Sequence, residues 1–166
     1  NVPAGQTFSV QGAHAVVASD GTSSPSQNFT INPKVVLSPT SGAVGSSDTI
    51  TLSGFAATSA VTALFGATSI SLGSSTTDAH GALTTTYTVP SGTADSVHGA
   101  HTVAATDAST NTANATFTIT AAISVNPTFG DKDTTGITLT ATGFAATSAV
   151  TGTLEGLALT LSASTT

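Results

Sequence analysis

The feature that most constrains this chain is an internal repeat. The sequence Gly-Phe-Ala-Ala-Thr-Ser-Ala-Val-Thr occupies residues 54–62 and again residues 143–151, at an offset of 89 residues. A second match, at an offset of 87 residues, relates Val-Pro-x-Gly and Gly-Ala-His within 2–14 to the same motifs within 89–101. A repeat of about 88 residues is large enough to enclose its own core, unlike solenoid units of roughly 20–45 residues. The sequence therefore predicts separate folded units joined end to end.

The matches place the chain across three repeats. Residues 33–121 form one complete repeat, 1–32 form the C-terminal part of a preceding repeat, and 122–166 form the N-terminal half of a following one. We expect either a window on a longer repetitive polypeptide, or copies whose ends complete one another. In the second case, 122–166 of one copy and 1–32 of the next lack only the counterpart of 78–87, as in donor-strand complementation. In both cases the strands of the two ends need partners.

Within the complete repeat, apolar and polar residues alternate with the period of a β-strand, and no segment shows helical periodicity. Two short segments have turn chemistry, Asp78-Ala-His-Gly81 and Asp107-Ala-Ser-Thr110. The strands expected are 34–38, 49–53, 60–65, 68–72, 82–89, 100–106 and 113–120. About seven short strands with turns at this spacing predict an all-β antiparallel sandwich.

The order of these motifs is similar to that of a known family. The chain reads Pro-Thr-Ser-Gly at 39–42, Ile-Thr-Leu-Ser-Gly-Phe at 50–55, Thr-Asp-Ala-His-Gly at 77–81, Val-Pro at 89–90 and Thr-Val-Ala-Ala-Thr-Asp at 102–107. This order resembles the tandem Ig-like repeats of bacterial and archaeal surface or filament proteins, with IPT/TIG-type modules as the nearest pattern. The resemblance implies a tandem Ig-like β-sandwich fold and a cell-surface setting. It brings no catalytic residues, because its motifs are turns and core positions.

Charge is scarce in this chain. Only 6% of the residues are charged, against roughly 25% in an ordinary soluble domain, and the two basic residues are Lys34 and Lys132. A net charge of −6 argues against nucleic acid and anionic membranes as partners, because nothing neutralises phosphates. No apolar run is long enough to span a membrane. With little charge to protect strand edges, we expect self-association with copies of the same repeat protein.

Few side chains suggest a metal or a catalytic site. There is no cysteine, and no nucleophile motif such as G-x-S-x-G, so we expect no enzyme and no resident cofactor. His14 and His101 occupy the same repeat position and are interpreted as structural, although His98 and His101 together could offer two metal ligands. Asp131 and Asp133 resemble part of a calcium loop, because they place two carboxylates one residue apart. They are the weak candidates for a metal site.

Two sequons predict covalent glycans at Asn28 and Asn114, in Asn-Phe-Thr and Asn-Ala-Thr. Their repeat positions differ by two residues, which keeps both side chains on the same face of the sheet. An autocatalytic cross-link between Lys34 and Asn114, as in some bacterial surface modules, is disfavoured, because the next repeat has about Ala122 in place of Lys34 and no buried acid partner is evident. Asp20 and Asp107 are equivalent and are expected to cap hairpin turns.

These features favour a structural role. The leading hypothesis is a segment of an extracellular prokaryotic filament, pilus-like thread or surface layer that assembles by β-strand and lateral packing. The first alternative is a stalk of repeats in a cell-surface adhesin or carbohydrate-binding protein. A second alternative is an accessory domain of a secreted enzyme whose catalytic unit lies elsewhere.

Overall fold

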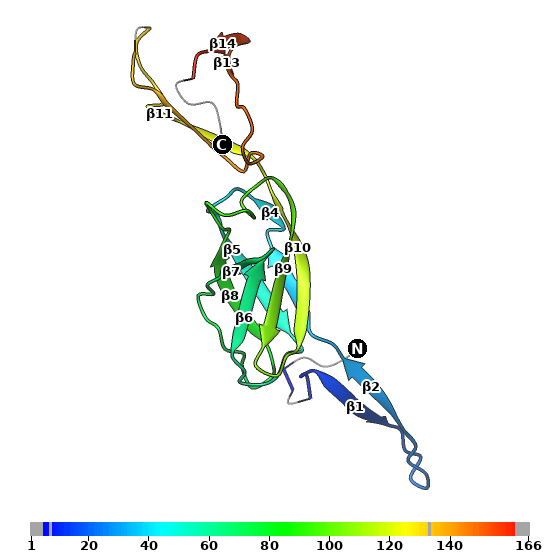
Figure 1. The fold of residues 1–166 in the computed structure, drawn as a ribbon. Helices are drawn as coiled ribbons and strands as arrows, with labels where there is room; N and C mark the ends of the chain where they lie inside the picture. The colour runs from blue at the N-terminus through cyan, green and yellow to red at the C-terminus, as the bar shows by residue number, and fades with distance from the viewer. Residues whose placement is uncertain (1–4, 7, 133, 162–166) are drawn as a thin grey trace.

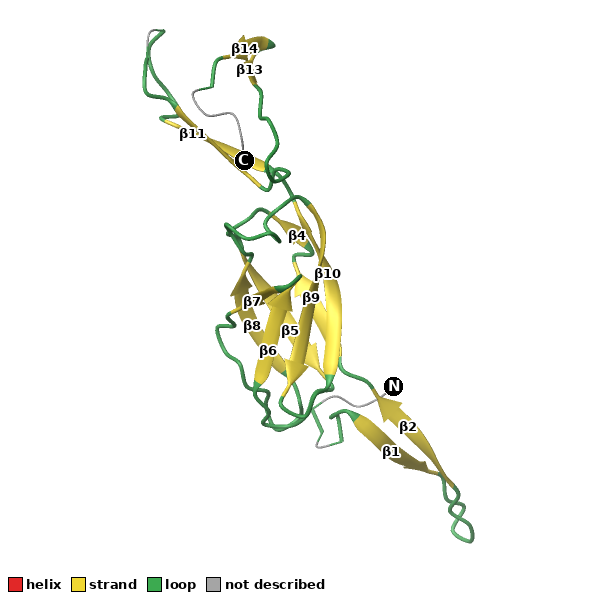
Figure 2. Ribbon diagram, viewed as in Figure 1, coloured by secondary structure: helices red, strands yellow, loops and turns green. Residues whose placement is uncertain are grey.

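The computed structural model describes residues 5, 6, 8–132 and 134–161 of the 166-residue chain. These residues form β-strands, turns and loops, with no helix among them (Figure 2). The middle of the chain is a compact body, and an extended segment leaves each of its two ends (Figure 1). No described segment is a helix long and apolar enough to cross a membrane.

Eight strands form the compact body. They are β3 (Lys34–Ser38), β4 (Ser41–Gly42), β5 (Ser47–Ser53), β6 (Val61–Phe65), β7 (Thr68–Ile70), β8 (Leu83–Thr88), β9 (Gly99–Asp107) and β10 (Thr112–Ile119). One sheet has the order β3-β5-β8 and the other has the order β4-β10-β9-β6-β7. All pairings are antiparallel except β4 with β10, which is parallel. The seven strands expected from the alternation are therefore present, in an all-β fold.

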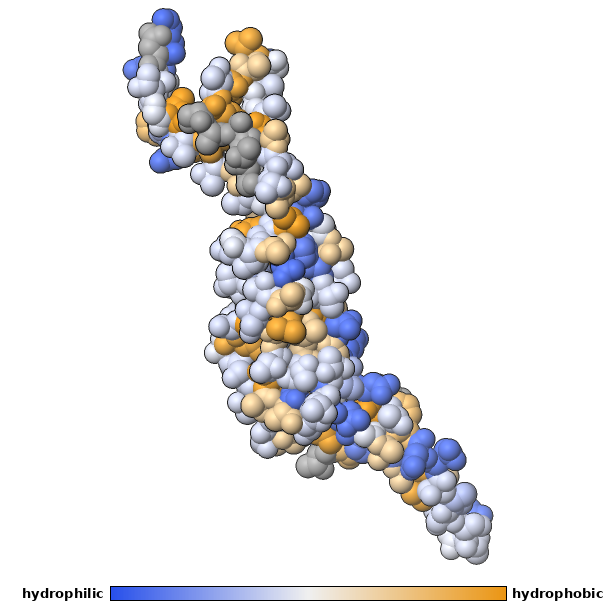
Figure 3. Space-filling model, in the orientation of Figure 1, coloured by the Kyte–Doolittle hydropathy of each residue, from blue (hydrophilic) through white to orange (hydrophobic). Residues whose placement is uncertain are grey.

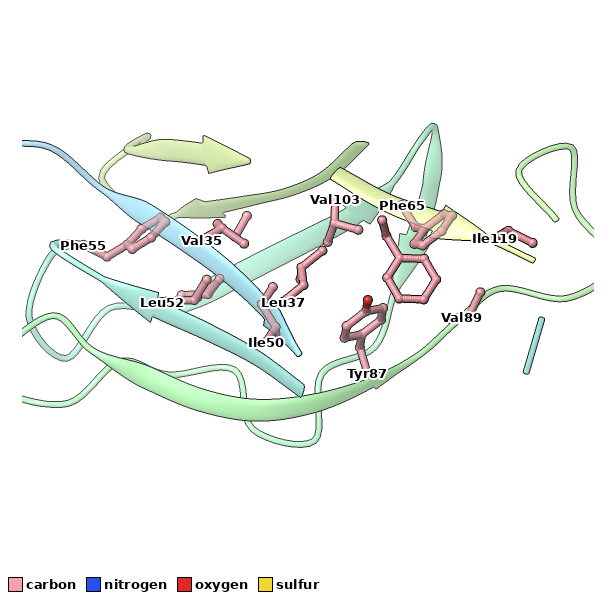
Figure 4. Packing of buried hydrophobic residues seen from close by; sticks show 13 residues of the cluster. Val35, Leu37, Ile50, Leu52, Phe55, Phe65, Tyr87, Val89, Val103 and Ile119 are labelled. Atoms are coloured by element: carbon pink, nitrogen blue, oxygen red, sulfur yellow. The ribbon is translucent and has the colours of Figure 1, made fainter. Parts of the chain in front are cut away.

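The core lies between the two sheets. Each strand alternates buried and exposed residues, as β3 and β6 show with Val35 and Leu37, and with Val61, Ala63 and Phe65. The large side chains that are fully buried come from both sheets and from the loops that join them (Figure 4). They are Ile50, Leu52, Phe55, Phe65, Tyr87, Val89, Val103, Phe117 and Ile119. Every buried hydrophobic residue of the described chain lies between Val35 and Ile119.

Three aromatic side chains form the centre of this core. Phe117 contacts Phe65 edge-on at a centroid distance of 5.8 Å and Tyr87 at 6.3 Å. Edge-to-face contacts of this kind are favourable beyond the area that they bury. The hydroxyl of Tyr87 is buried and has no hydrogen-bond partner among the described residues. Burial, together with the nearby Asp48 carboxylate, raises the pKa of Tyr87 above its ordinary value.

Strand β4 was not expected, because Pro39 and Gly42 indicate a break. The chain does break there, but it crosses from the three-stranded to the five-stranded sheet and pairs again with β10 at Thr118 and Ile119. A Cβ on Gly42 would lie 2.9 Å from the Ser46 hydroxyl oxygen and 3.3 Å from a ring carbon of Phe117. Glycine therefore allows the crossing chain to lie directly on the core.

Six more strands lie in the two end segments. They are β1 (Gly12–Val17), β2 (Ser26–Ile31), β11 (Ala122–Asn126), β12 (Thr138–Thr142), β13 (Gly152–Leu154) and β14 (Leu157–Leu159). They form three separate two-stranded antiparallel sheets, β1-β2, β11-β12 and β13-β14. Each sheet has a counterpart of the same register in the compact body. Gly12 lies opposite Ile31 as Gly99 lies opposite Ile119.

The C-terminal sheets repeat the same registers. In β11–β12, Val125 lies opposite Leu139, as Leu37 lies opposite Ile50 in β3–β5. In β13–β14, Leu154 lies opposite Leu157, at the positions that Phe65 and Thr68 hold in β6–β7. The pairing of strands is thus the same in both places, although the surroundings differ.

Candidate functional site

The two equivalent histidines have structural surroundings. The Nε2 atom of His101 lies 2.8 Å from the carbonyl oxygen of Val97, and that of His14 lies 2.9 Å from the carbonyl oxygen of Val10. The ring of His101 also lies on Phe65, at a centroid distance of 5.2 Å. One ring nitrogen of each histidine is therefore engaged with the loop that precedes its own strand.

None of the described residues considered for a metal site belongs to a group of three or more possible ligands. His98 is exposed and its backbone N–H donates to the carbonyl of Gly143 at 2.7 Å. Asp131 is exposed in a turn, where its carbonyl accepts from the N–H of Thr134 at 3.0 Å, and Asp133 lies outside the described residues. Within the described part of the chain, no group of three or more His, Asp or Glu residues could hold a metal ion.

The cross-link considered between Lys34 and Asn114 does not fit the fold. Lys34 alternates with the buried Val35 and Leu37, so it lies on the outer face of the three-stranded sheet. Asn114 is exposed and alternates with Ala113 and Ala115, which lie against the core. The two side chains therefore point away from opposite faces of the body. The geometry therefore gives no support to this cross-link, which the sequence already disfavoured.

Both sequon asparagines are accessible. Asn28 is exposed on β2, opposite Ala15, and Asn114 is exposed on β10, opposite Ala104. Phe29 and Phe117 are equivalent in the two hairpins, because they lie opposite His14 and His101. Each asparagine is an odd number of residues from that phenylalanine, so both lie on the outer face. Glycosylation at these positions stays a prediction.

Four carboxylates, those of Asp20, Asp78, Asp95 and Asp107, hold loops by accepting backbone hydrogen bonds. Asp107, which is only 4% exposed, accepts from Ala56 N–H at 2.8 Å and Ser109 N–H at 2.9 Å. Asn111 adds its backbone N–H at 3.0 Å and its side-chain amide at 2.9 Å. Burial alone raises the pKa of Asp107, but these four hydrogen bonds outweigh it and hold the pKa below its usual range. The turn role expected for this residue is present, and it extends to a distant loop.

Asp20 is the counterpart of Asp107 in the first hairpin. It is exposed and accepts from the N–H groups of Ser23 at 2.7 Å and Thr22 at 2.9 Å, both within its own turn. These backbone hydrogen bonds, and a third from the Thr22 hydroxyl, lower the pKa of Asp20 to about 2. The local turn contacts are thus repeated, but the contact with a distant loop is not.

Asp95 was missed by sequence reasoning. Its Oδ2 accepts from the Thr68 hydroxyl at 2.7 Å and from the N–H groups of Ala67 and Thr68, each at 3.0 Å. The hydroxyl of Thr68, followed by these two N–H groups, lowers the pKa of Asp95. The turn between β6 and β7 is therefore fastened by a residue nearly thirty positions later. No local sequence signal marks such a contact.

The main candidate for a functional surface is the set of apolar faces left uncovered in the end segments. In the first hairpin, Phe29 is 47% exposed, whereas its counterpart Phe117 is fully buried. Val16 is likewise exposed, whereas its counterpart Val103 is buried. The first hairpin therefore presents to solvent the face that its counterpart buries in the core.

The C-terminal segment shows the same contrast. Leu154 is 67% exposed, whereas its counterpart Phe65 is fully buried. Ile123 and Val125 on β11 are also exposed, and they correspond to the buried pair on β3. Figure 3 shows apolar atoms at the tip of β13–β14 and on the inner side of the fork between that hairpin and β11. Several large exposed apolar side chains in one segment are typical of an interaction surface.

An open groove of about 540 Å³ lies where the C-terminal segment meets the compact body. Its apolar lining includes Leu139, Phe144 and Val150, which are the counterparts of the core residues Ile50, Phe55 and Val61. The other wall comes from the body and includes Val44 and Val97. The groove is therefore the position of a core that the C-terminal segment does not fill by itself.

Comparisons with protein-family models, with curated proteins and with solved structures found no significant match to this chain.

Proposed function

We propose that this chain is a structural part of an extracellular prokaryotic filament, pilus-like thread or surface layer, built from tandem Ig-like β-sandwich repeats of about 88 residues. Two sheets ordered β3-β5-β8 and β4-β10-β9-β6-β7 support the Ig-like assignment. Support for tandem repetition comes from the end segments, whose three ladders have the same registers as ladders of the compact body. The assignment gives the chain no catalytic role.

The observation that carries this proposal is the uncovered apolar face at each end of the chain. Soluble monomers rarely leave several large apolar side chains exposed on one face. They also protect strand edges with charge, and this chain has only two lysines and no more than eight acidic residues. A surface with exposed apolar faces and few charges favours self-association over an independent monomer.

A second candidate is a stalk of repeats that holds an adhesive or carbohydrate-binding tip away from the cell. The observation in its favour is the end-to-end arrangement of the segments in Figure 1. Only Thr120 and Ala121 separate β10 from β11. A hydrogen bond from the N–H of His98 in the compact body to the carbonyl of Gly143 in the C-terminal segment crosses this joint. Short joints of this kind limit bending and suit a spacer as well as a filament.

Electron microscopy of the purified protein, with sedimentation velocity at several concentrations, tests the two candidates. The filament or layer proposal predicts fibres or lattices and a sedimentation coefficient that rises with concentration. Discrete monomers at all concentrations would overturn it. Monomers that bind a glycan array or a cell surface would support the stalk instead.

The outer faces of β2 and β10 are the proposed positions of covalent glycans, at Asn28 and Asn114. Sugar on these exposed faces leaves the core side of each hairpin free, so modification is compatible with assembly. Mass spectrometry of the protein from its native host tests this. Unmodified peptides at both asparagines would contradict the proposal, and glycopeptides at both would support it.

A further inference from the structure

The compact body shows what covers an apolar face of this kind. There, β9 pairs antiparallel with β6, with Phe65 opposite Val103 and Ala63 opposite Ala105. This pairing brings β10 over the core, where Phe117 contacts Phe65. The β9–β10 hairpin is therefore the element that covers β6.

The first hairpin has the features needed to act in the same way. Strand β1 carries the same Gly-Ala-His sequence as β9 and the same register with its partner strand. Val16 and Phe29 stand where Val103 and Phe117 stand, and both are exposed. Among the described residues, β1 pairs only with β2, so the edge that corresponds to the β6-facing edge of β9 is free.

Strand β13 has the complementary features. It holds the position of β6, with Leu154 in place of Phe65 and Gly152 in place of Ala63. In the described chain it pairs only with β14, so the edge on which β6 receives β9 is free. The groove beside it is lined by Leu139, Phe144 and Val150. These apolar side chains face the space that a hairpin would fill.

We propose that the β1–β2 hairpin of one copy docks on the C-terminal segment of a second copy, with β1 antiparallel to β13. Transfer of the β6–β9 register places Val16 opposite Leu154, Val17 opposite Thr153 and Ala18 opposite Gly152. This proposal rests on the self-assembly proposed above and specifies its contact. The contact is heterologous, since it joins two different surfaces. It therefore leaves one hairpin and one C-terminal segment free at the ends of each assembly, and the assembly can extend.

The composite unit formed in this way contains counterparts of β3, β5, β6, β7, β9 and β10 of the compact body. In the body, β8 pairs with the edge of β5 from Ser47 to Leu52. Among the described residues, the equivalent edge of β12 is unpaired, so it is available to a further strand.

Cysteine cross-linking tests the register, because the natural chain contains no cysteine. One preparation carries Val17→Cys and a second carries Thr153→Cys, and both positions are exposed. After mixing under mild oxidation, we expect a disulfide-linked dimer of one chain of each kind. Residues directly opposite in a ladder meet the distance limits of a disulfide. A Leu64→Cys/Ala104→Cys chain is the positive control, because these two residues are opposite in β6 and β9.

The register control replaces Val17→Cys by Ser19→Cys, which is two positions further along the same edge. The docking model predicts a cross-link to Thr153→Cys from Val17→Cys that is at least about tenfold faster than from Ser19→Cys, because the displaced pair lies too far apart. Equal rates would show unspecific association and overturn the proposal. Monomers alone, while the intramolecular control still oxidises, would also overturn it.

A second pair of variants tests the contact without cysteine. Val16→Asp places a charge on the proposed contact face, whereas Val36→Asp places one on the outer face of β3, where Val36 is also exposed. We expect Val16→Asp to raise the dissociation constant about tenfold or more and Val36→Asp to leave it unchanged. Equal effects would contradict docking through β1.

The results of these experiments distinguish docking of the first hairpin from the filament or layer role on which it rests. Fibres without the Val17–Thr153 cross-link would leave a filament role standing and refute docking of the first hairpin. Cross-linked dimers without fibres or lattices would confirm the contact and refute the filament role. Fibres that lose their order in Val16→Asp and keep it in Val36→Asp would support both.

Discussion

The β9–β10 hairpin and the β1–β2 hairpin have the same register, yet only the first contributes to a core. Phe117 is fully buried on β10, whereas Phe29, at the equivalent place on β2, is about half exposed. Asp107 joins its turn to the distant Ala56, whereas Asp20 contacts only its own turn. The same local sequence thus forms the same ladder in two environments.

The comparison separates what neighbouring residues determine from what distant partners add. Strand pairing within a hairpin follows from alternation and turn chemistry, so it is repeated wherever the sequence repeats. Burial requires a second sheet, and in the described part of the chain only the compact body has one. An isolated two-stranded hairpin is marginally stable in water at best. We therefore expect the free energy of unfolding to be concentrated in the compact body.

The largest difference in the free energy of unfolding should be between alanine variants of the two equivalent phenylalanines, Phe117 and Phe29. Phe117→Ala removes a fully buried ring at the centre of the core and should lower the free energy of unfolding by about 3–5 kcal/mol. Phe29→Ala should change it by less than about 0.5 kcal/mol in dilute protein, because the ring is not in a core. Urea unfolding followed by tyrosine fluorescence measures this. Tyr87 is the only tyrosine in the sequence, which has no tryptophan, and it lies in the core.

Similar losses from both phenylalanine variants would break the comparison. That result would mean that the first hairpin unfolds together with the compact body. It would also mean that the exposure of the Phe29 ring does not reduce its contribution to the free energy of unfolding. In concentrated protein, self-association should show the opposite ranking of the two variants from the free energy of unfolding. Phe29→Ala should weaken self-association, since this ring lies on the proposed contact face.

The next largest difference in the free energy of unfolding should be between variants of the two equivalent aspartates, Asp107 and Asp20. Asp107→Ala leaves the part-buried N–H groups of Ala56, Ser109 and Asn111 without their acceptor, and should lower the free energy of unfolding by about 2–3 kcal/mol. Asp20→Ala should not change it measurably, because its turn is exposed. The same urea experiment is the measurement. Asp107→Asn, which keeps one acceptor oxygen, should lie between Asp107→Ala and the natural chain, and a loss equal to that of Asp107→Ala would contradict this account.

Much of the fold could be predicted from the sequence, because its strands alternate regularly. The strand that contains Ile50 and Leu52 ends just before Gly54, and the observed β5, Ser47–Ser53, includes the expected residues 49–53. The short strand β4 could not be predicted, since Pro39 and Gly42 indicate only a break. Its pairing with β10 depends on where the chain goes after crossing between sheets. Assignment of strands to sheets is non-local in the same sense, so the spacing of Lys34 and Asn114 alone could not show that their side chains lie on opposite outer faces.

The candidate surface was harder to predict than the ladders. Alternation identifies which side chains share a face, and Val16 and Phe29 follow the pattern of Val103 and Phe117. Whether that face is covered depends on a second sheet, which no local pattern describes. Asp95 is a similar case, because its contact with Thr68 spans many residues and has no motif. Local order was therefore predictable, and long-range contacts were not.

Acid should destabilise the compact body through its loop-holding carboxylates. Hydrogen bonds lower the pKa of Asp78, Asp95 and Asp107 in the folded chain below the ordinary aspartate value of 3.8. A lowered folded pKa gives stability that is complete well above pH 4. This stability is lost as the pH falls from the unfolded value through the folded one. The urea midpoint followed by Tyr87 should therefore be constant near pH 6 and should decrease between about pH 4.5 and pH 2.

Matched variants identify the source of this pH dependence. Asp107→Asn should flatten the decrease, because one of the titrating acceptors is gone. Asp20→Asn should leave it unchanged, although the pKa of Asp20 is also lowered, to about 2, because its hairpin lies outside the core. A midpoint that rises on acidification, or a decrease altered equally by both variants, would contradict the assignment.

The smallest difference in the free energy of unfolding should be between variants of the two equivalent histidines, His101 and His14. Both rings contact a backbone carbonyl four residues earlier, so the local interaction is the same in the two hairpins. Only His101 also lies on a buried phenylalanine, Phe65, whereas His14 has an edge contact with Phe8 at 6.5 Å. His101→Ala should lower the free energy of unfolding by about 1–2 kcal/mol, and His14→Ala should leave it unchanged. Because the local contact is common to both, the difference between the two variants measures what the distant partner adds. An equal loss from both would show that the first hairpin belongs to the same cooperative unit as the compact body, with little need for a second copy to cover it.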